Sequence, residues 1–266
     1  MKIGLIGLPK SGKTTLFNLL TGSHVATARY DAGRAELHTG VARVPDPRVD
    51  RLSALFTPKK TTYASFEVVD LAGIAKGERA GLETKEFRNA DALLHVVRAF
   101  TDEVSGPPDP KRDIVDLETE LILADLDVVD RRLERLEASI KKQRKEAEVR
   151  EQEILRRLKA ALEAETPLRA VDLGPEDAKA VRGFNFLSEK PILHCLNLDE
   201  KALGEGTRDV LARAVASFTL AGIGDRPCTR LGWVSALIET EVAQLEEEAQ
   251  RAFLADLGLE ERTINR

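Results

Sequence analysis

Short apolar runs recur along the chain and alternate with helical or polar stretches. The first run, residues 2–7 (KIGLIG), is bounded by glycine and is typical of a buried parallel strand, and LFNLL from Leu16 then repeats at helical spacing. Further runs of the same kind occupy residues 66–71, 92–97 and 191–196, and residues 37–44 fit an antiparallel edge strand. The pattern predicts an α/β fold, a mostly parallel sheet with helices on both faces.

A different pattern begins at Pro107 and continues to about Pro167, where glycine is absent and charged residues, leucine and alanine dominate. Apolar residues recur there at alternating steps of four and three, which is a heptad seam made of Ile122, Leu126, Val129, Leu133, Leu136 and Ile140. A second, shorter set follows the charged segment 141–153 and consists of Leu155, Leu158 and Leu162. The two sets predict an antiparallel coiled-coil hairpin of two helices inserted into the α/β domain.

This reading divides the chain into three parts. Residues 1–106 form the first part of the α/β domain, residues 107–180 the helical insert, and residues 181–266 the second part of the α/β domain. A final helical stretch is expected from Leu237 to Leu257.

Charge and cysteine usage exclude some classes of protein. The formal net charge of −5 and a pI near 5.6 give no overall attraction to DNA or to an anionic membrane, and no apolar run reaches the length of a membrane span. Cys195 and Cys228 lack CxxC spacing and suit reduced thiols. We expect a cytoplasmic protein that contacts neither membrane nor DNA directly.

The strongest motif is GLPKSGKT at Gly7–Thr14, which satisfies GxxxxGK[ST] between the first predicted strand and the helix that follows it. Glycines let the backbone wrap an anion, and successive amides at a helix N-terminus point partial positive charge at phosphates. Lys13 adds a full charge and the Thr14 hydroxyl is a hard ligand for Mg²⁺. The residues expected to contact the nucleotide here are Gly7, Pro9, Lys10, Ser11, Gly12, Lys13, Thr14 and Thr15. The motif therefore predicts a P-loop NTPase domain, expected to be of the Ras-like kind, that binds ATP or GTP with Mg²⁺.

A second cluster, Asp70-Leu-Ala-Gly73, ends the strand FEVVD. Asp70 fits the second carboxylate near magnesium, and the Gly73 amide fits the group that senses the γ-phosphate, so Gly73 and Lys13 are the candidate catalytic residues. Ras-type GTPases place a water-orienting glutamine directly after that glycine. Here Ile74 stands there and has no hydrogen-bonding group on its side chain.

A third cluster, Asn197-Leu198-Asp199-Glu200, follows a strand at the carboxyl edge of the sheet, where a base binds in doubly wound folds. It occupies the place of the guanine-reading NKxD, with Leu198 for the lysine and Glu200 for the aspartate. A carboxylate that is one methylene longer need not preserve guanine selectivity. Ser235 and Ala236 resemble the second base loop of such proteins.

These clusters, together with VPDPRVDRL (44–52), HVVRAF (95–100), residues 107–136, NLDEK and VSALIETEV, resemble the Obg-like ATPase or YchF family of P-loop NTPases over essentially the whole chain. The resemblance implies a P-loop domain interrupted by a helical hairpin, a hydrophobic residue in place of the catalytic glutamine, and ATP accepted as well as or better than GTP. It also implies a cytosolic protein with the ribosome, or a translation-related protein, as partner.

The chain departs from that family in several places. Members carry a C-terminal β-grasp (TGS) domain after the segment matching FLADLGLEE (253–261), and we expect this chain to lack it. The first switch is a divergent stretch, residues 23–36, in which Thr27 is a distant candidate for the threonine that binds Mg²⁺. The second switch, residues 78–87, is also altered. We expect these changes in the switch segments to affect hydrolysis of the nucleotide more than its binding.

Lys10 stands where the family has an asparagine. Its ammonium either points into solvent or lies near the phosphates, where it would supply in cis a charge that other members obtain from a monovalent ion or a partner. The four histidines show no mutual ligand spacing, and His95 and His194 are expected to be hydrogen-bonded structural residues.

Two functional classes remain open. The first is a slow NTPase without a side-chain general base, and the second is a nucleotide-dependent switch that acts through the helical hairpin on a partner. A degenerate relative that binds nucleotide without turnover, and a GTPase, are the further alternatives. The oligomeric state does not follow from the sequence.

Overall fold

The computed structural model describes residues 1–24, 37–71, 85–102, 106–202 and 222–257, together with single residues at 212, 216, 259, 262 and 264. Among them is a six-stranded sheet in the order β2-β3-β1-β4-β5-β6. Its strands are β1 (Lys2–Ile6), β2 (Leu37–Arg43), β3 (Ser65–Leu71), β4 (Ala92–Ala99), β5 (Ile192–Leu198) and β6 (Thr229–Val234). All neighbours are parallel except β2, which runs antiparallel to β3 at one edge. The predicted fold class, including the antiparallel edge strand, is confirmed.

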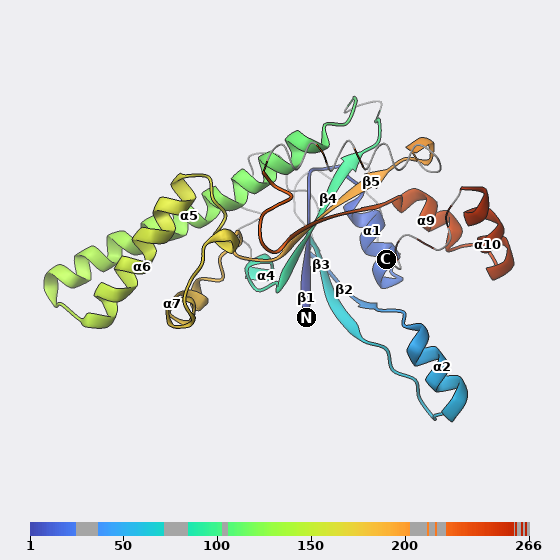
Figure 1. The fold of residues 1–266 in the computed structure, drawn as a ribbon, viewed down its shortest axis with the longest axis horizontal. Coiled ribbons are helices and arrows are strands. Elements are labelled where there is room, and N and C mark those ends of the chain that lie inside the picture. Colours follow the sequence, from blue (N-terminus) through green and yellow to red (C-terminus); the bar gives the residue numbers. More distant parts are fainter. Residues whose placement is uncertain are drawn as a thin grey trace.

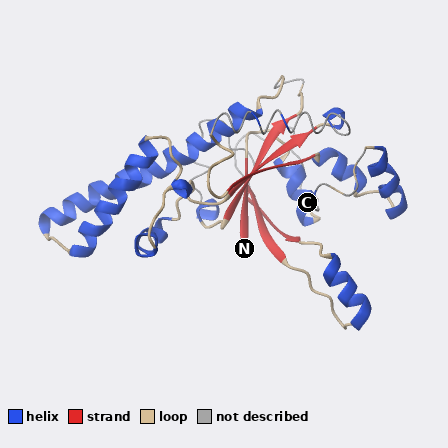
Figure 2. Ribbon diagram, viewed as in Figure 1, coloured by secondary structure: helices blue, strands red, loops and turns tan. Residues whose placement is uncertain are grey.

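Helices cover both faces of this sheet. Neighbouring residues of a strand point to opposite faces, and β1 has apolar side chains on both, so each face packs against helices. On one face, Leu5 packs with Leu16 and Phe17 of α1 (Lys13–Thr21). On the other, Ile6 packs with Leu121 of α5 (Pro110–Lys142) and with Phe87 of α4 (Lys85–Arg88). Figure 2 shows the strands fanning between these helical layers.

The helical hairpin consists of α5 and α6 (Glu146–Glu163), joined by the three residues 143–145, and it extends away from the sheet (Figure 1). Its antiparallel register is visible in cross-helix ion pairs, Arg132 with Glu151 at 2.7 Å and Lys159 with Asp130 at 2.7 Å. The predicted seam lies in its core, where Ile122, Val129, Leu133 and Leu136 are buried with Leu155, Leu158 and Leu162, while Leu126 and Ile140 pack against them half-buried.

One helix, α5, belongs to two cores. Its first half places Ile114, Leu121 and Ala124 against the sheet, and its second half builds the hairpin. The chain returns from α6 through short helices at Leu168–Ala170, α7 (Pro175–Val181) and Arg182–Phe184 to β5. The three-part division at residues 107 and 180 stays a prediction.

The last predicted helix, Leu237–Leu257, is wrong as a single element. The structure has α9 (Ala236–Val242) and α10 (Glu247–Asp256), separated by a turn in which Gln250 Nε2 donates to the Leu245 carbonyl. The break returns Leu254 to the apolar cluster that holds Ile238 and Val242. A straight helix would carry Leu254 away from this cluster, since twelve residues of α-helix rise by about 18 Å.

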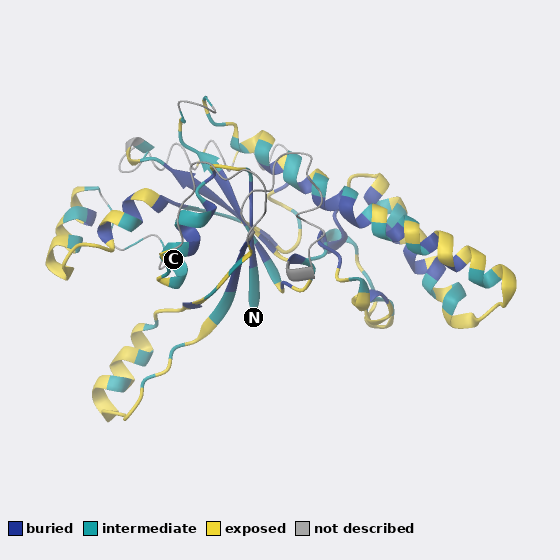
Figure 3. Cartoon of the chain, turned by 180° about the vertical axis from the view of Figure 1, so that it is seen from behind, coloured by how far each residue is buried: buried dark blue, intermediate teal, exposed yellow. Residues whose placement is uncertain are grey.

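Helix α2 (Pro47–Phe56) was not predicted by the apolar pattern. Asp46 caps it by accepting from the Arg48 amide at 2.9 Å, Pro47 occupies its first turn, and Thr57 ends it with a φ of 42°. No residue of α2 is buried, and the helix projects from the sheet edge beyond β2 (Figures 1 and 3). We call residues 37–60 the β2–α2 arm.

Within the described residues, no helix combines the length and the apolar character that crossing a bilayer requires.

Candidate functional site

The loop between β1 and α1 has the backbone that the GxxxxGK[ST] pattern requires. Gly7 and Gly12 adopt φ angles of 148° and 95°. A Cβ atom on Gly7 would lie 2.4 Å from the Val96 carbonyl oxygen, and one on Gly12 would lie 2.2 Å from Asn197 Nδ2. Both positions therefore accept only glycine, for reasons of conformation and of space.

Lys13 is buried beneath the loop, with its ammonium donating to the carbonyl oxygens of Gly7 and Leu8 at 2.9 Å each. Burial lowers the pKa of Lys13 to about 8, and the charge of Asp70 partly opposes that shift. An anion held in the loop would offset the cost of burying this charge. The geometry is that of a cation positioned to meet a phosphate.

Asp70, near the end of β3, contacts Thr14 in the first turn of α1. Thr14 Oγ1 donates to Asp70 Oδ2 at 3.1 Å. The carboxylate is fully buried, its pKa is raised by burial, and its Oδ1 atom has no hydrogen-bond partner within the described structure. Two hard oxygens, one of them a buried carboxylate oxygen without a partner, fit the donor set that Mg²⁺ prefers.

Asn197 ties the phosphate loop to the predicted base loop. Its Nδ2 donates to the Ser11 carbonyl at 3.0 Å, and its Oδ1 accepts from the Ala236 amide at 2.9 Å. The hydroxyls of Ser11 and Ser235 are buried beside these contacts and have no hydrogen-bond partner among the described residues. The fold thus brings together Ser11, Asn197, Ser235 and Ala236 from three separate segments.

Leu198 and Glu200, the other site residues predicted in the third cluster, do not join this group of contacts. The Leu198 side chain is buried in an apolar cluster with Ile114 and Leu196, while Glu200 is exposed in a short 3₁₀ helix. Pro9 is exposed on the loop, and Thr15 is half-buried in the first turn of α1. Gly73, Ile74 and Thr27 lie outside the described residues, so their predicted roles stay predictions.

Lys10 holds a left-handed φ of 63° and places its ammonium 3.9 Å from Asp102 Oδ2. Its side chain is 46% exposed. This position is intermediate between the two predicted from the sequence, one in solvent and one near the phosphates. Asp102 was not predicted as part of this site. Its position shortly after β4, at the carboxyl end of a strand next to β1, was the available signal.

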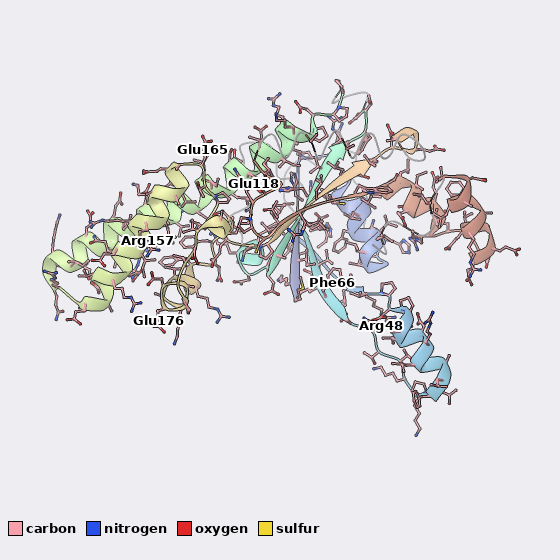
Figure 4. The ribbon with its side chains drawn as sticks, in the orientation of Figure 1. Arg48, Phe66, Glu118, Arg157, Glu165 and Glu176 are labelled. Atoms are coloured by element: carbon pink, nitrogen blue, oxygen red, sulfur yellow. The ribbon has the colours of Figure 1, made fainter. Side chains whose placement is uncertain are left out.

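His95 and His194 lie on neighbouring strands and contact each other through Nδ1 atoms 3.0 Å apart, both fully buried. His194 Nε2 lies 3.3 Å from Glu118 of α5, whose carboxylate also binds Arg169 at 2.5 Å. Both histidines are buried and make the hydrogen-bonded contact expected of structural residues, and Glu118, labelled in Figure 4, links His194 to α5 at the base of the hairpin.

Comparison with known proteins gives consistent matches. A family model described as a 50S ribosome-binding GTPase matches residues 2–155. The ribosome-binding ATPase YchF of Bacillus subtilis is 38% identical over 271 residues, covering 98% of this chain and 72% of the relative. That of Escherichia coli O157:H7 is 35% identical over 274 residues, covering 100% of this chain and 73% of the relative. The solved structure of the Schizosaccharomyces pombe YchF GTPase superposes with a TM-score of 0.80 at 25% identity, over 100% of this chain and 73% of that one.

Proposed function

The chain belongs to the YchF family of ribosome-binding ATPases, and from that membership we propose that it binds ATP with Mg²⁺ on the loop Gly7–Thr14 and associates with the ribosome. ATP and the ribosome are the two partners for which its relatives are named. The single observation that carries the nucleotide proposal is the convergence of Lys13, Thr14 and Asp70 at one end of the sheet.

Each of these residues has a defined part in binding. The loop amides and the Lys13 ammonium would hold the β- and γ-phosphates, and the phosphate charge would favour the protonated form of Lys13. Thr14 Oγ1 and Asp70 would hold Mg²⁺, which when bound neutralises phosphate charge. The partnerless Oδ1 of Asp70 supports this assignment.

The base loop supports ATP over GTP. Both polar atoms of the Asn197 amide are engaged, one by Ser11 and one by Ala236. This side chain therefore fixes the shape of the base loop. Leu198 is buried in the core, whereas a lysine stands at that place in NKxD. Glu200, which takes the place of the aspartate of NKxD, is exposed in the short 3₁₀ helix that follows β5 and would be the carboxylate offered to the base.

Hydrolysis of the bond between the β- and γ-phosphates is expected to be slow. Lys13 and the amide of Gly73 would stabilise developing charge, while Ile74 offers no group to orient water. Lys10 would add a charge in cis by moving from Asp102 toward the phosphates. Replacing Lys10 with asparagine should then lower turnover and change its potassium dependence, and unchanged values would contradict this role.

A nucleotide-dependent switch is the second candidate function, favoured by the divergent stretches 23–36 and 78–87. An enzyme keeps multiple turnover without a partner, whereas a switch shows nucleotide-dependent affinity for purified ribosomes even when turnover is negligible. A steady-state phosphate-release assay beside ribosome co-sedimentation with ADP and a non-hydrolysable ATP analogue distinguishes them.

Titration calorimetry of non-hydrolysable ATP and GTP analogues with Mg²⁺ tests the binding proposal, with Lys13→Ala as the loss variant and Lys159→Ala on the hairpin as the matched control. Tighter binding of the ATP analogue, abolished only by Lys13→Ala, is the expected result. Tighter binding of the GTP analogue would contradict the preference for ATP and indicate a GTPase. Failure of both to bind would overturn the nucleotide proposal.

A further inference from the structure

Exposed large apolar side chains gather in two places on this molecule. Eleven such side chains are exposed within the described ranges. Six belong to the β2–α2 arm: Leu37, Val41, Val44, Leu52, Leu55 and Phe56. Two more, Leu237 and Leu245, lie on α9 and on the turn before α10. Exposed apolar side chains that gather on the same element are a feature of interaction sites.

On the arm, the apolar face has helical spacing. Leu52, Leu55 and Phe56 stand at i, i+3 and i+4 of α2 and are 56%, 74% and 71% exposed. This is the arrangement with which a helix lays an apolar face on a partner. The opposite face of the helix contacts the chain that follows the arm, where Ser53 Oγ lies 2.6 Å from Thr61 Oγ1 and Tyr63 donates to Asp50. The outer apolar face therefore has no cover in the described chain.

The arm is basic although the whole chain is acidic. Residues 37–60 contain five Lys or Arg and two Asp, a net charge of +3 in a chain of net charge −5. Both acids are engaged by neighbouring residues, Asp46 by Arg48 within the arm and Asp50 by Tyr63 just after it. Figure 4 shows Arg48 on the arm, far from the hairpin that carries Arg157.

The second patch has the opposite charge. Residues 236–256, which span α9 and α10, contain six Asp or Glu and one Arg, a net charge of −5. Of the six acids only Glu239 is buried, where Arg262 pairs with it at 2.8 Å, and the others are exposed around Leu237 and Leu245. This patch therefore offers an apolar centre with an acidic surround.

We propose that the β2–α2 arm docks on the α9–α10 patch of a second copy of this chain, and that the two copies exchange arms reciprocally. One molecule carries both halves of a contact that matches in apolar character and is complementary in charge, and opposite charges steer such an encounter. A two-fold arrangement makes the contact twice, because arm meets patch and patch meets arm. The arm and the α9–α10 pair lie on the same side of the sheet, opposite the hairpin, so reciprocal docking leaves the hairpin uncovered (Figures 1 and 3). The proposal is independent of nucleotide binding.

Sedimentation velocity of the full chain, from micromolar to hundreds of micromolar concentration, tests the inference. We expect a monomer–dimer equilibrium that weakens as salt rises. Arg51→Glu with Lys59→Glu on the arm should weaken association about tenfold or more, as should Glu241→Lys with Glu248→Lys on the patch. Combining the two pairs should restore association, which loss of folding could not do. The matched control is Lys141→Glu with Lys142→Glu at the hairpin tip, which changes the net charge by the same amount and should leave the dimer intact.

Several results would overturn the inference. These are a monomer at every concentration, equal weakening by the hairpin-tip control, or failure of the combined variant to restore association. Open-ended polymers would show that arm and patch meet without exchange, against the reciprocal arrangement. Loss of ribosome co-sedimentation on arm reversal, in a chain that stays monomeric, would assign the arm to a different partner.

Discussion

Single residues at the phosphate loop are constrained by contacts that no local pattern contains. Gly12 begins α1, and the space where its side chain would stand is filled by Asn197, which lies 185 positions further along the chain. The motif predicts glycine at this position for its φ angle. The steric reason comes only from the folded arrangement of β1 beside β4 and β5.

Gly12→Ala and Gly22→Ala separate these two effects on one helix. Gly22 ends α1 with a φ of 66°, and a Cβ there meets nothing within 4 Å. We expect Gly22→Ala to cost about 1 kcal/mol of stability and to keep nucleotide binding. Gly12→Ala should abolish binding, since its Cβ would collide with Asn197. Urea unfolding and calorimetry measure both, and equal loss of binding in the two variants would contradict the steric argument.

Asn197 gives a second prediction at this scale. Asn197→Asp keeps an acceptor for the Ala236 amide but loses the donor to the Ser11 carbonyl, whereas Asn197→Ala loses both. An unsatisfied buried group costs about 1–3 kcal/mol. We therefore expect both variants to lower nucleotide affinity and stability, with the aspartate variant lower in both because its buried charge would face the Ser11 carbonyl and the bound phosphates. Calorimetry and thermal melting would detect this order, and an alanine variant with unchanged affinity would remove Asn197 from the site.

At the scale of elements, two buried carboxylates fix the base of the hairpin. Glu118 and Asp125 stand two turns apart on α5. Glu118 binds Arg169, which follows α6, and Asp125 accepts from the amides of Leu187 and Ser188 at 2.9 Å and 2.7 Å. The outgoing helix and the returning chain are thereby joined to each other where they leave the sheet.

Glu118 should give the protein a distinct acid response. Burial alone would raise its pKa, but contacts with His194 and Arg169 outweigh burial and lower it from 4.5 to about 2. A carboxylate with a depressed folded pKa contributes stability that is complete above the unfolded value, here 4.5, and is lost as pH falls toward 2. Glu118→Gln should lose about 3 kcal/mol at neutral pH and show a flatter stability profile between those pH values. Urea midpoints across that range measure it, and parallel profiles would contradict the assignment.

The sequence predicted the elements that have a strong internal period and missed those defined by tertiary contacts. The heptad seam of α5 and α6 is in the pattern itself, so the hairpin was predictable. Helix α2 was missed because its apolar residues Leu52, Leu55 and Phe56 face outward and match no core. The break between α9 and α10 contains no proline or glycine, and it arises because Leu254 packs with Val242.

Across the whole molecule, α5 joins the sheet core to the hairpin core without interruption. Its 33 residues extend about 50 Å at ~1.5 Å per residue. The backbone geometry of the phosphate loop could be predicted from the sequence, because the motif lies in one contiguous segment. The links among distant segments, such as Asn197 to Ser11 or Glu118 to Arg169, could not, because no spacing along the chain encodes them.

Shared use of α5 predicts cooperative unfolding of the two parts. Trp233, the only tryptophan, reports on the sheet from β6, and far-UV circular dichroism reports mainly on the helices. The two signals should give one coincident urea transition. Leu126→Pro, placed between the sheet half and the hairpin half of α5, should separate them into two transitions. Separate transitions in the unaltered chain would show that the two cores unfold independently.

The closed base of the hairpin also limits how this insert can change length during evolution. Adding one residue to α5 or α6 alone would rotate everything beyond it by about 100° and separate pairs such as Arg132 with Glu151. Matched additions to both helices next to residues 143–145 would preserve every existing pair and the contacts of Glu118 and Asp125. Longer and shorter relatives should therefore differ at the tip by paired lengths, while the residues nearest the sheet stay aligned without gaps.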